Sequence, residues 1–250
     1  MAWALRGGTP ANNGGSASPL TIVLGAQVSV GDRIIVVIDF NRAVDPPSIS
    51  SVTDNLGNVY SQDLVGSNTI DVLNNVQFRH WVYSAPVTVG GTPTISAAGV
   101  FGNGTIVAAA YSGLDQSATP VDVSVAAGAY PGNASPTSGA TAVTGAVSEL
   151  IIGAFSNDGQ NKTFTAGAGF TVRASGVGGG TNGDIAIEDK DSGLSLAAQT
   201  ADGTLNASST WNMSCVVYKL SISVVVTEIQ PDVGMALSSK PVSGSAKEGF

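Results

Sequence analysis

One stretch, residues 105–125 (TIVAAAYSGLDQSATPVDVSV), contains the pattern that governs most of this chain. Side chains along a strand point alternately to its two faces, and residues 106–111 are apolar at every position. This pattern is typical of a strand with neighbours on both faces. A Ser-Gly-Leu-Asp corner at residues 112–115 interrupts the strand, and Pro120 precedes the next alternating run. This unit of strand, corner and strand recurs at a spacing of roughly ten residues, which predicts an all-β protein.

The other strand candidates show the same alternation or a continuous apolar run. Residues 33–40 (RIIVVIDF) and 149–155 (ELIIGAF) are apolar enough for central strands that are buried on both faces. Residues 49–60 are expected to form a hairpin around a turn at 55–58. The remaining candidates are residues 20–24, 27–30, 76–83, 94–98, 184–190, 194–199 and 211–220.

Together these strands predict an antiparallel two-sheet β-sandwich, jelly-roll-like, with extended N- and C-terminal arms. No segment has a sustained helical period, and the 32 glycines and 11 prolines recur too closely for long helices. We expect an irregular arm at residues 1–19, a sandwich domain at residues 20–220, and a strand followed by a tail at residues 221–250.

Both arms carry apolar residues that are suited to contacts with a partner. Trp3 and Leu5 are the large apolar residues of the glycine-rich N-terminal arm. In the C-terminal segment, Ile222, Val224 and Val226 alternate with Ser221, Ser223 and Val225. Such a strand can add to the exposed sheet edge of a neighbouring copy, or it can close the sheet of its own chain. The sequence leaves these two arrangements open.

Charged residues are scarce and mostly acidic. They make up 11% of the chain, against about 25% in ordinary soluble proteins, and the formal net charge is −8. Ten scattered Lys and Arg residues cannot form a basic stripe, which argues against a nucleic-acid partner. The most apolar segment, residues 20–40, is interrupted by Gly31, Asp32 and Arg33, so no membrane span is expected. A surface this poor in charge favours packing against copies of itself or against a larger particle.

No motif predicts a cofactor site or a metal site. Residues 178–183 (GGGTNG) match the dinucleotide glycine pattern, but a strand rather than a helix is expected after them. Asp184, Glu188, Asp189 and Asp191 could supply oxygen ligands to calcium, although their spacing differs from the twelve-residue calcium loop. A solvated strand end is the preferred interpretation of this acidic group, with calcium as the alternative.

Catalytic groups and sugar-binding groups are equally sparse. His80 is the sole histidine and lies on an apolar strand face, and the single Cys215 is expected to be a small buried hydrophobe. We therefore expect no enzymatic activity, with a hydrolase as the least favoured alternative. Tyr130, in a long loop, and Trp81 are the aromatic residues that a carbohydrate-binding module would use, although Trp81 and Trp211 fit a sheet core better.

Four segments together resemble one family of β-sandwich domains. They are TDNLGNVY (residues 53–60), AAAYSGLDQSATPVDVS (108–124), SELIIGAFSNDG (148–159) and WNMSCVVYKL (211–220). Members of that family occur in tailed-phage structural proteins and in bacterial surface or secreted proteins. The resemblance covers roughly residues 20–220 and implies the fold, and it transfers no catalytic residue because the family has no agreed set. The N-terminus lacks an apolar run of signal-peptide length, and the tail at 221–250 is an addition, so both departures favour the phage members.

The function expected from these features is that of a non-enzymatic structural protein of a phage virion. A head decoration or cement protein fits best: made in the host cytoplasm, placed on the virion exterior, and bound to its own copies and to capsid or other virion proteins. No cofactor, nucleic acid or membrane partner is expected. The alternative is a carbohydrate-binding or adhesion module of a surface or tail-fibre protein, which would bind a glycan.

Overall fold

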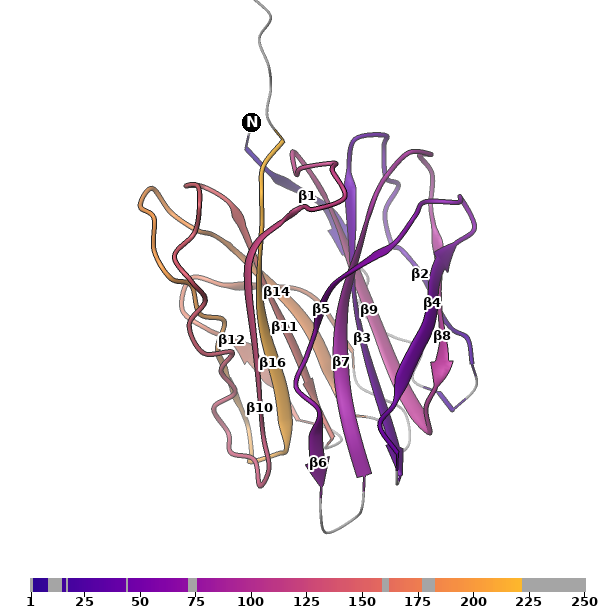
Figure 1. The fold of residues 1–250 in the computed structure, drawn as a ribbon, viewed down its shortest axis with the longest axis vertical. Helices are drawn as coiled ribbons and strands as arrows, with labels where there is room; N and C mark the ends of the chain where they lie inside the picture. Colours follow the sequence, from indigo (N-terminus) through magenta and orange to yellow (C-terminus); the bar gives the residue numbers. More distant parts are fainter. Residues whose placement is uncertain are drawn as a thin grey trace, which may run out of the picture.

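The computed structural model describes residues 2–8, 15–16, 18–43, 45–71, 76–158, 162–176 and 183–221. Within these ranges the chain contains no helix, and every strand pair is antiparallel. The described strands form sheets of six, five, three and two strands (Figure 1). The prediction of an all-β, antiparallel chain is therefore confirmed, with four sheets in place of the expected two.

The sheets have the following membership. The six-stranded sheet has the order β1 (Ala4–Gly8), β9 (Asn103–Ser112), β3 (Arg33–Ala43), β7 (Val76–Pro86) and β5 (Ser61–Val65), with β6 (Thr69–Asp71) also paired to β7. The five-stranded sheet has the order β10 (Val121–Ala129), β16 (Trp211–Tyr218), β11 (Leu150–Asn157), β14 (Ile185–Asp191) and β13 (Thr171–Gly176). The three-stranded sheet is β2 (Leu20–Val23), β8 (Thr94–Val100) and β4 (Ser48–Asp54), and the two-stranded sheet is β12 (Phe164–Ala166) with β15 (Gly203–Leu205).

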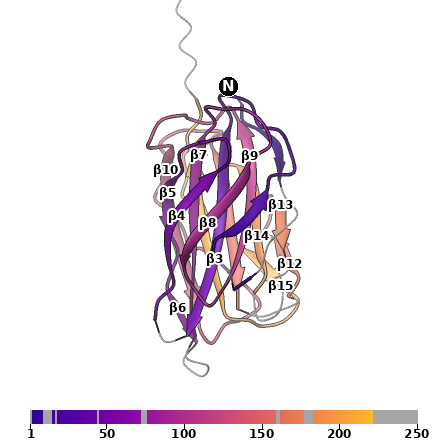
Figure 2. The same ribbon diagram turned by 90° about the vertical axis from the view of Figure 1, so that its right-hand side faces the viewer.

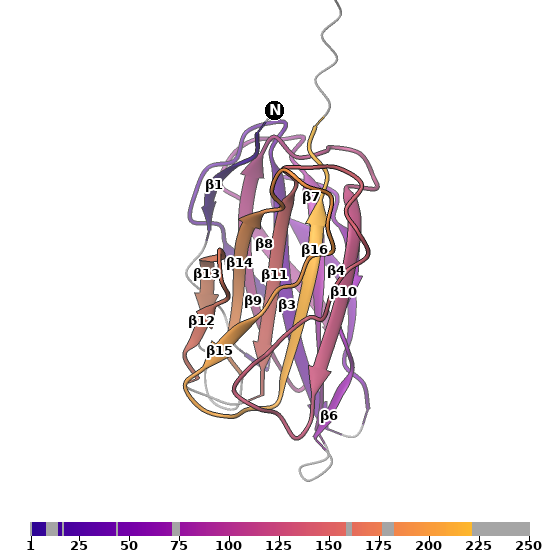
Figure 3. The same ribbon diagram turned by 90° about the vertical axis from the view of Figure 1, so that its left-hand side faces the viewer.

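The two large sheets pack face to face in the middle of the molecule. The outer face of each is covered as well. The three-stranded sheet covers one side, as Figure 2 shows, and β12, β15 and the neighbouring loops cover the other, as Figure 3 shows. Strand β3 shows the consequence for the sequence: Ile34, Val36 and Ile38 pack toward the three-stranded sheet. The residues between them, Ile35 and Val37, pack toward the five-stranded sheet. A strand buried on both faces needs a continuous apolar run, which explains why residues 33–40 and 149–155 are correctly predicted as central strands.

The corner after β9 carries the chain from one large sheet to the other, because β9 belongs to the six-stranded sheet and β10 to the five-stranded sheet. Gly113 has a φ of +77°, and a Cβ atom on it would lie 2.5 Å from the carbonyl oxygen of Ala2. Any other residue would therefore be strained here and would collide with the N-terminal strand segment. The glycine in this corner is required by both backbone conformation and space.

A buried arginine holds this corner in place. Arg33 donates from Nε to the carbonyl oxygen of Asp115, from Nη2 to that of Ser117, and from Nη1 to Oγ of Ser84, each at 2.8 Å. The arginine therefore ties strand β3 to the corner and to strand β7. The carboxyl group of Asp63 lies near its charge and accepts a hydrogen bond of 2.6 Å from the Tyr218 hydroxyl of the facing sheet. A buried cation is tolerated only where it is paired and hydrogen-bonded in this way.

Two local predictions differ from the structure. Residues 49–60 do not form a hairpin, because β4 and β5 belong to different sheets. The Asp54 carboxylate accepts hydrogen bonds from the backbone N–H groups of Leu56 (2.9 Å) and Asn58 (3.1 Å), and this turn redirects the chain between the sheets. Residues 27–30 and 194–199 contribute only the isolated bridges Val28–Gly91 and Val143–Ala198 instead of strands.

The N-terminal segment also differs from the expected irregular arm. Strand β1 pairs with β9 and so forms one edge of the six-stranded sheet. A Cβ atom on Gly7 would lie 2.5 Å from Cβ of Ala26, and one on Gly8 would lie 2.4 Å from the carbonyl oxygen of Arg173. The glycines of this strand therefore permit close packing, which composition alone does not distinguish from an irregular segment.

Replacing Arg33 tests the buried hydrogen-bond network. We expect Arg33→Met to lower the free energy of unfolding by about 3–5 kcal/mol, because three acceptors lose their donor and Asp63 loses its positive neighbour. Arg42→Met is the matched control on the same strand, since Arg42 pairs with Asp45 at an exposed site. The control should cost less than about 1 kcal/mol. Urea unfolding measures both, and equal losses would contradict the role given to Arg33.

Candidate functional site

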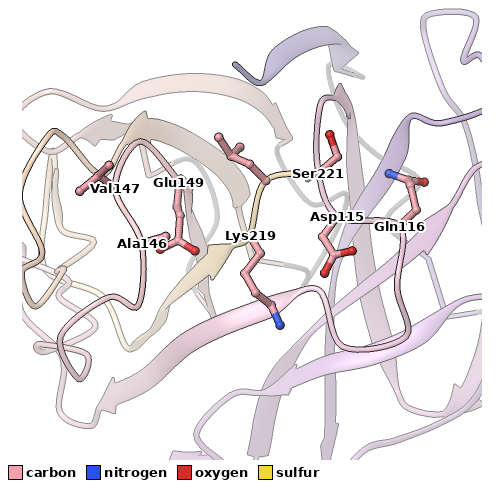
Figure 4. A pocket seen from close by; sticks show the side chains of 8 residues that line it. Asp115, Gln116, Ala146, Val147, Glu149, Lys219 and Ser221 are labelled. Carbon is pink, nitrogen blue, oxygen red and sulfur yellow. The ribbon is translucent and has the colours of Figure 1, made fainter. Parts of the chain in front are cut away.

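A pocket lies where the chain leaves strand β16. It has a volume of about 630 Å³ and is lined by the apolar residues Ala146, Val147 and Leu220 and by polar or charged residues that include Asp115, Glu149 and Lys219. Figure 4 shows these side chains on three segments: the corner after β9, the loop before β11, and the end of β16. The pocket therefore combines apolar walls with both signs of charge.

Backbone hydrogen bonds hold the walls of the pocket. On one side, the N–H of Asp115 bonds to the carbonyl oxygen of Lys219 and the N–H of Ser221 to that of Gly113, both at 2.9 Å. On the other side, the N–H of Ser148 bonds to the carbonyl oxygen of Gly193 at 2.8 Å. The end of β16 is thus fastened to the corner after β9, and the loop before β11 is fastened to residues 193–199.

Glu149 is the unusual group in this pocket. Its side chain is 1% exposed, and neither carboxylate oxygen has a hydrogen bond of normal geometry to a described residue. Burial raises the pKa of Glu149 to about 7, and the nearby carboxyl group of Asp122 adds to the shift. Asp122 itself accepts a hydrogen bond of 2.5 Å from the N–H of Gly145. Lys219 already lies near this carboxyl group, and a further cation in the pocket would oppose the combined negative charge of Glu149 and Asp122.

An apolar patch adjoins the pocket. It consists of Val143, Val147, Leu194 and Leu196, which are 59%, 42%, 87% and 56% exposed. These residues lie on two segments that pair through the Val143–Ala198 bridge and through the hydrogen bond from Thr144 N–H to the Ala197 carbonyl oxygen. Clustered exposed apolar side chains of this size are typical of interaction surfaces. We name these four residues the apolar patch.

The only histidine of the chain lies in a buried polar row between the two large sheets. Nδ1 of His80 is 3.2 Å from Oγ of Ser156, and Nε2 contacts Oγ of Ser214. Asp39 faces Ser156 from strand β3. Burial lowers the pKa of His80 to about 3 and raises that of Asp39 to about 8. The prediction of a packed histidine is confirmed, and a serine, histidine and aspartate enclosed on all sides offer a substrate no access.

The prediction of a solvated strand end is wrong for most of the acidic residues in and just before strand β14. Asp184, Glu188 and Asp189 are buried, and only Asp191 is exposed. Glu188 Oε2 accepts a hydrogen bond from Gly167 N–H (3.3 Å), whereas Asp189 bonds to Nε of Arg173 (2.7 Å) on the opposite face. The side chains of Glu188 and Asp189 therefore point to opposite faces of the sheet, and both faces are covered. No group of three or more His, Cys, Asp or Glu side chains in the described ranges is arranged to hold a metal ion.

The aromatic candidates occupy different environments. Trp81 is 4% exposed and packs edge-to-face on Phe40 at a centroid distance of 5.7 Å, so its ring cannot serve as a sugar platform. Trp211 is equally buried, and Tyr130 is half-buried in its loop. Trp3 packs edge-to-face on Tyr111 at 6.0 Å within the chain's own core.

Several other predicted residues can be placed. Leu5 packs against the same core as Trp3, and Cys215 is buried, which raises the pKa of its thiol to about 12. Ile222, Val224 and Val226 lie outside the described residues, as does most of the glycine motif at 178–183. The expected strand after that motif is confirmed as β14.

Sequence reasoning missed the pocket and the apolar patch. Their residues come from four segments that lie far apart in the sequence, and no local pattern shows that these segments meet. The one available sign is Glu149, an acidic residue that directly precedes a strand in which every residue is buried. A carboxylate at that position must either reach solvent or acquire a partner.

No family model, curated protein or solved structure matches this chain. The described ranges contain no helix that is long and apolar enough to cross a membrane. What is established is therefore an all-β protein with several antiparallel sheets, and the family resemblance remains an expectation.

The buried histidine can be tested directly, because His80 is the only histidine in the chain. We expect its ring proton resonances to stay at neutral-imidazole positions between pH 8 and roughly pH 5, since burial disfavours the charged form. A one-dimensional NMR titration of the folded protein measures this. A midpoint near the ordinary value of 6.5 would mean that solvent reaches the ring.

Glu149 gives a second test, through the pH dependence of stability. The folded state keeps the Glu149 proton up to about pH 7, whereas the unfolded state loses it near 4.5, so its stabilising effect fades as the pH rises between these values. We expect Glu149→Gln to be more stable than the unchanged chain at pH 8, by about 1 kcal/mol, and the two to converge near pH 5. Urea unfolding of dilute protein at both pH values measures the difference. A constant difference would show that Glu149 does not titrate in this range.

Proposed function

We propose that this chain is a non-enzymatic structural protein of a phage virion, a head decoration or cement protein on the outside of the capsid. It binds copies of itself and capsid or other virion proteins through outer surfaces that become covered on assembly. The apolar patch carries this proposal. A side chain such as Leu194, 87% exposed beside three other exposed apolar residues, gains free energy when a partner covers it.

The charge content supports the same function. With 11% charged residues, the surface has few groups that would lose hydration in the centre of an interface. Glu149 is the exception, and it lies beside the apolar patch in a pocket that an incoming cation could enter. The pocket and patch together have the chemical character of a protein-binding surface.

The fold proposed with this function is a jelly-roll-like β-sandwich of the kind found in phage structural proteins. The six- and five-stranded sheets, which share one apolar core, correspond to its two sheets. The three- and two-stranded sheets are then additions that cover the outer faces. The resemblance of residues 20–220 to that family supports this assignment.

A carbohydrate-binding module is the weaker alternative. It requires exposed aromatic rings, and of its candidates only Tyr130 keeps partial exposure while Trp81 lies in the core. A glycan array with the purified chain separates the two functions, because specific retention on a glycan favours the module.

Assembly is the property that tests the proposal. We expect the full chain to sediment as an oligomer, and a version that ends at Ser221 to sediment at a lower mass with an unchanged β-sheet circular dichroism spectrum. Ending at Ser221 preserves its hydrogen bond to Gly113, which fastens β16 to the corner. Analytical ultracentrifugation over a range of concentrations measures the masses, and mass spectrometry of virions from the source shows whether the chain is present. A full chain that stays monomeric and is absent from virions would refute the function.

A further inference from the structure

The described chain ends at the rim of the pocket. Ser221 is one of the residues that line it, so residues 222–250 begin there. An extended chain spans at most about 3.3–3.6 Å per residue, so this segment has a reach of up to about 100 Å. That distance exceeds the size of one domain, and the segment can therefore reach a neighbouring copy.

The chemistry of the segment complements the pocket and the apolar patch. Ile222, Val224 and Val226 supply apolar side chains, and Lys240 and Lys247 supply two of the ten cationic residues of the chain. The pocket offers apolar walls at Val147 and Leu220 and a buried carboxylate at Glu149 without a normal hydrogen bond. A lysine is well suited to such a site, because its aliphatic stem packs on apolar surface while its ammonium group meets the carboxylate.

We propose that the pocket and the apolar patch of one copy bind residues 222–250 of a second copy, with apolar residues of the segment on the patch and a lysine ammonium at Glu149. This inference rests on the proposed function, since it specifies the surface through which the copies join.

The length of residues 222–250 allows the contact to join two copies. A reach of up to about 100 Å is enough for the segment of one copy to meet the pocket of another, as the proposed assembly requires. Residues 222–229 (ISVVVTEI) contain no glycine, proline, asparagine or aspartate, and β-branched residues dominate them. Such a composition is typical of segments that pair with or pack on a partner surface rather than of turns.

The charges around Glu149 set the pH dependence of this contact. Asp122 from strand β10 and Asp115 from the corner add negative charge. Lys219 after β16 acts on both Glu149 and Asp115, and Arg33 of β3 acts on Asp115. The site has more carboxylates than cations, so a second lysine is attracted once Glu149 is ionised. Binding should therefore be tighter above pH 7 than at pH 5.5.

Cysteine cross-linking in the full chain tests the contact. Val147→Cys is placed in the patch of one preparation, and Val224→Cys in the segment of another that carries a size tag; native Cys215 is buried. We expect mixing followed by mild oxidation to give a disulfide-linked heterodimer. Val23→Cys, which is 56% exposed on strand β2 of the three-stranded sheet, is the matched control and should give little product with Val224→Cys.

The other outcomes separate this inference from the proposed function. If the unchanged chain is oligomeric but Val147→Cys cross-links no better than the control, the inference fails and the assembly function stands. If a chain carrying both substitutions forms the disulfide only within itself, the segment binds in cis and the inference fails. If the unchanged chain is monomeric at all concentrations, the assembly function fails as well.

A second measurement tests the lysine contact. We expect Glu149→Gln to weaken association by about tenfold at pH 8 and to have little effect at pH 5.5, as removal of one partner of a desolvated charge pair predicts. Asp191→Asn removes an exposed carboxylate on β14 and should leave association unchanged at both pH values. Lys240→Gln and Lys247→Gln are made separately. The variant that removes the lysine bound at Glu149 should weaken association as much as Glu149→Gln does, and the other variant should not. Unchanged association in Glu149→Gln at pH 8 would overturn this part of the inference.

Discussion

The contact between the two large sheets is the constraint on which the rest of the molecule depends. Both facing surfaces are apolar in the middle, with Val37 of one sheet and Ile152 of the other in the same buried core. The buried Arg33 side chain is held beside that core by hydrogen bonds to three acceptors. Because each large sheet is also covered on its outer face, the chain needs apolar residues at consecutive positions, and this leaves few positions for charge.

Continuous apolar runs made much of the fold predictable. Residues 33–40 and 149–155 could be recognised as central strands because burial on both faces leaves a signal at every position. The turn at Asp54 shows the limit, since a turn that joins two strands of one sheet and a turn that joins two sheets use the same residues. The buried carboxylates of β14 show another limit. A strand rich in acidic residues is predicted to be exposed to solvent, and the sequence does not show which loops and strands pack over it.

The candidate site was less predictable than the fold, for a physical reason. An interaction surface is made of side chains that the fold leaves uncovered, and the pattern of residues 194–199 predicts a strand without showing that Leu194 stays exposed. Glu149 directly precedes a core strand, and its side chain lines a pocket. The scarcity of charge predicted that some surface should be covered by a partner, and the three-dimensional arrangement supplied a specific candidate.

The corner glycine has a consequence for how the molecule is oriented among its neighbours. The carbonyl group of Ala2 packs against Gly113, whose own carbonyl oxygen accepts a hydrogen bond from Ser221. The first and last described residues therefore emerge at one end of the stacked sheets (Figure 1). The described part of the chain is directional: the segments that precede Ala2 and follow Ser221 both start from the same end of the stacked sheets.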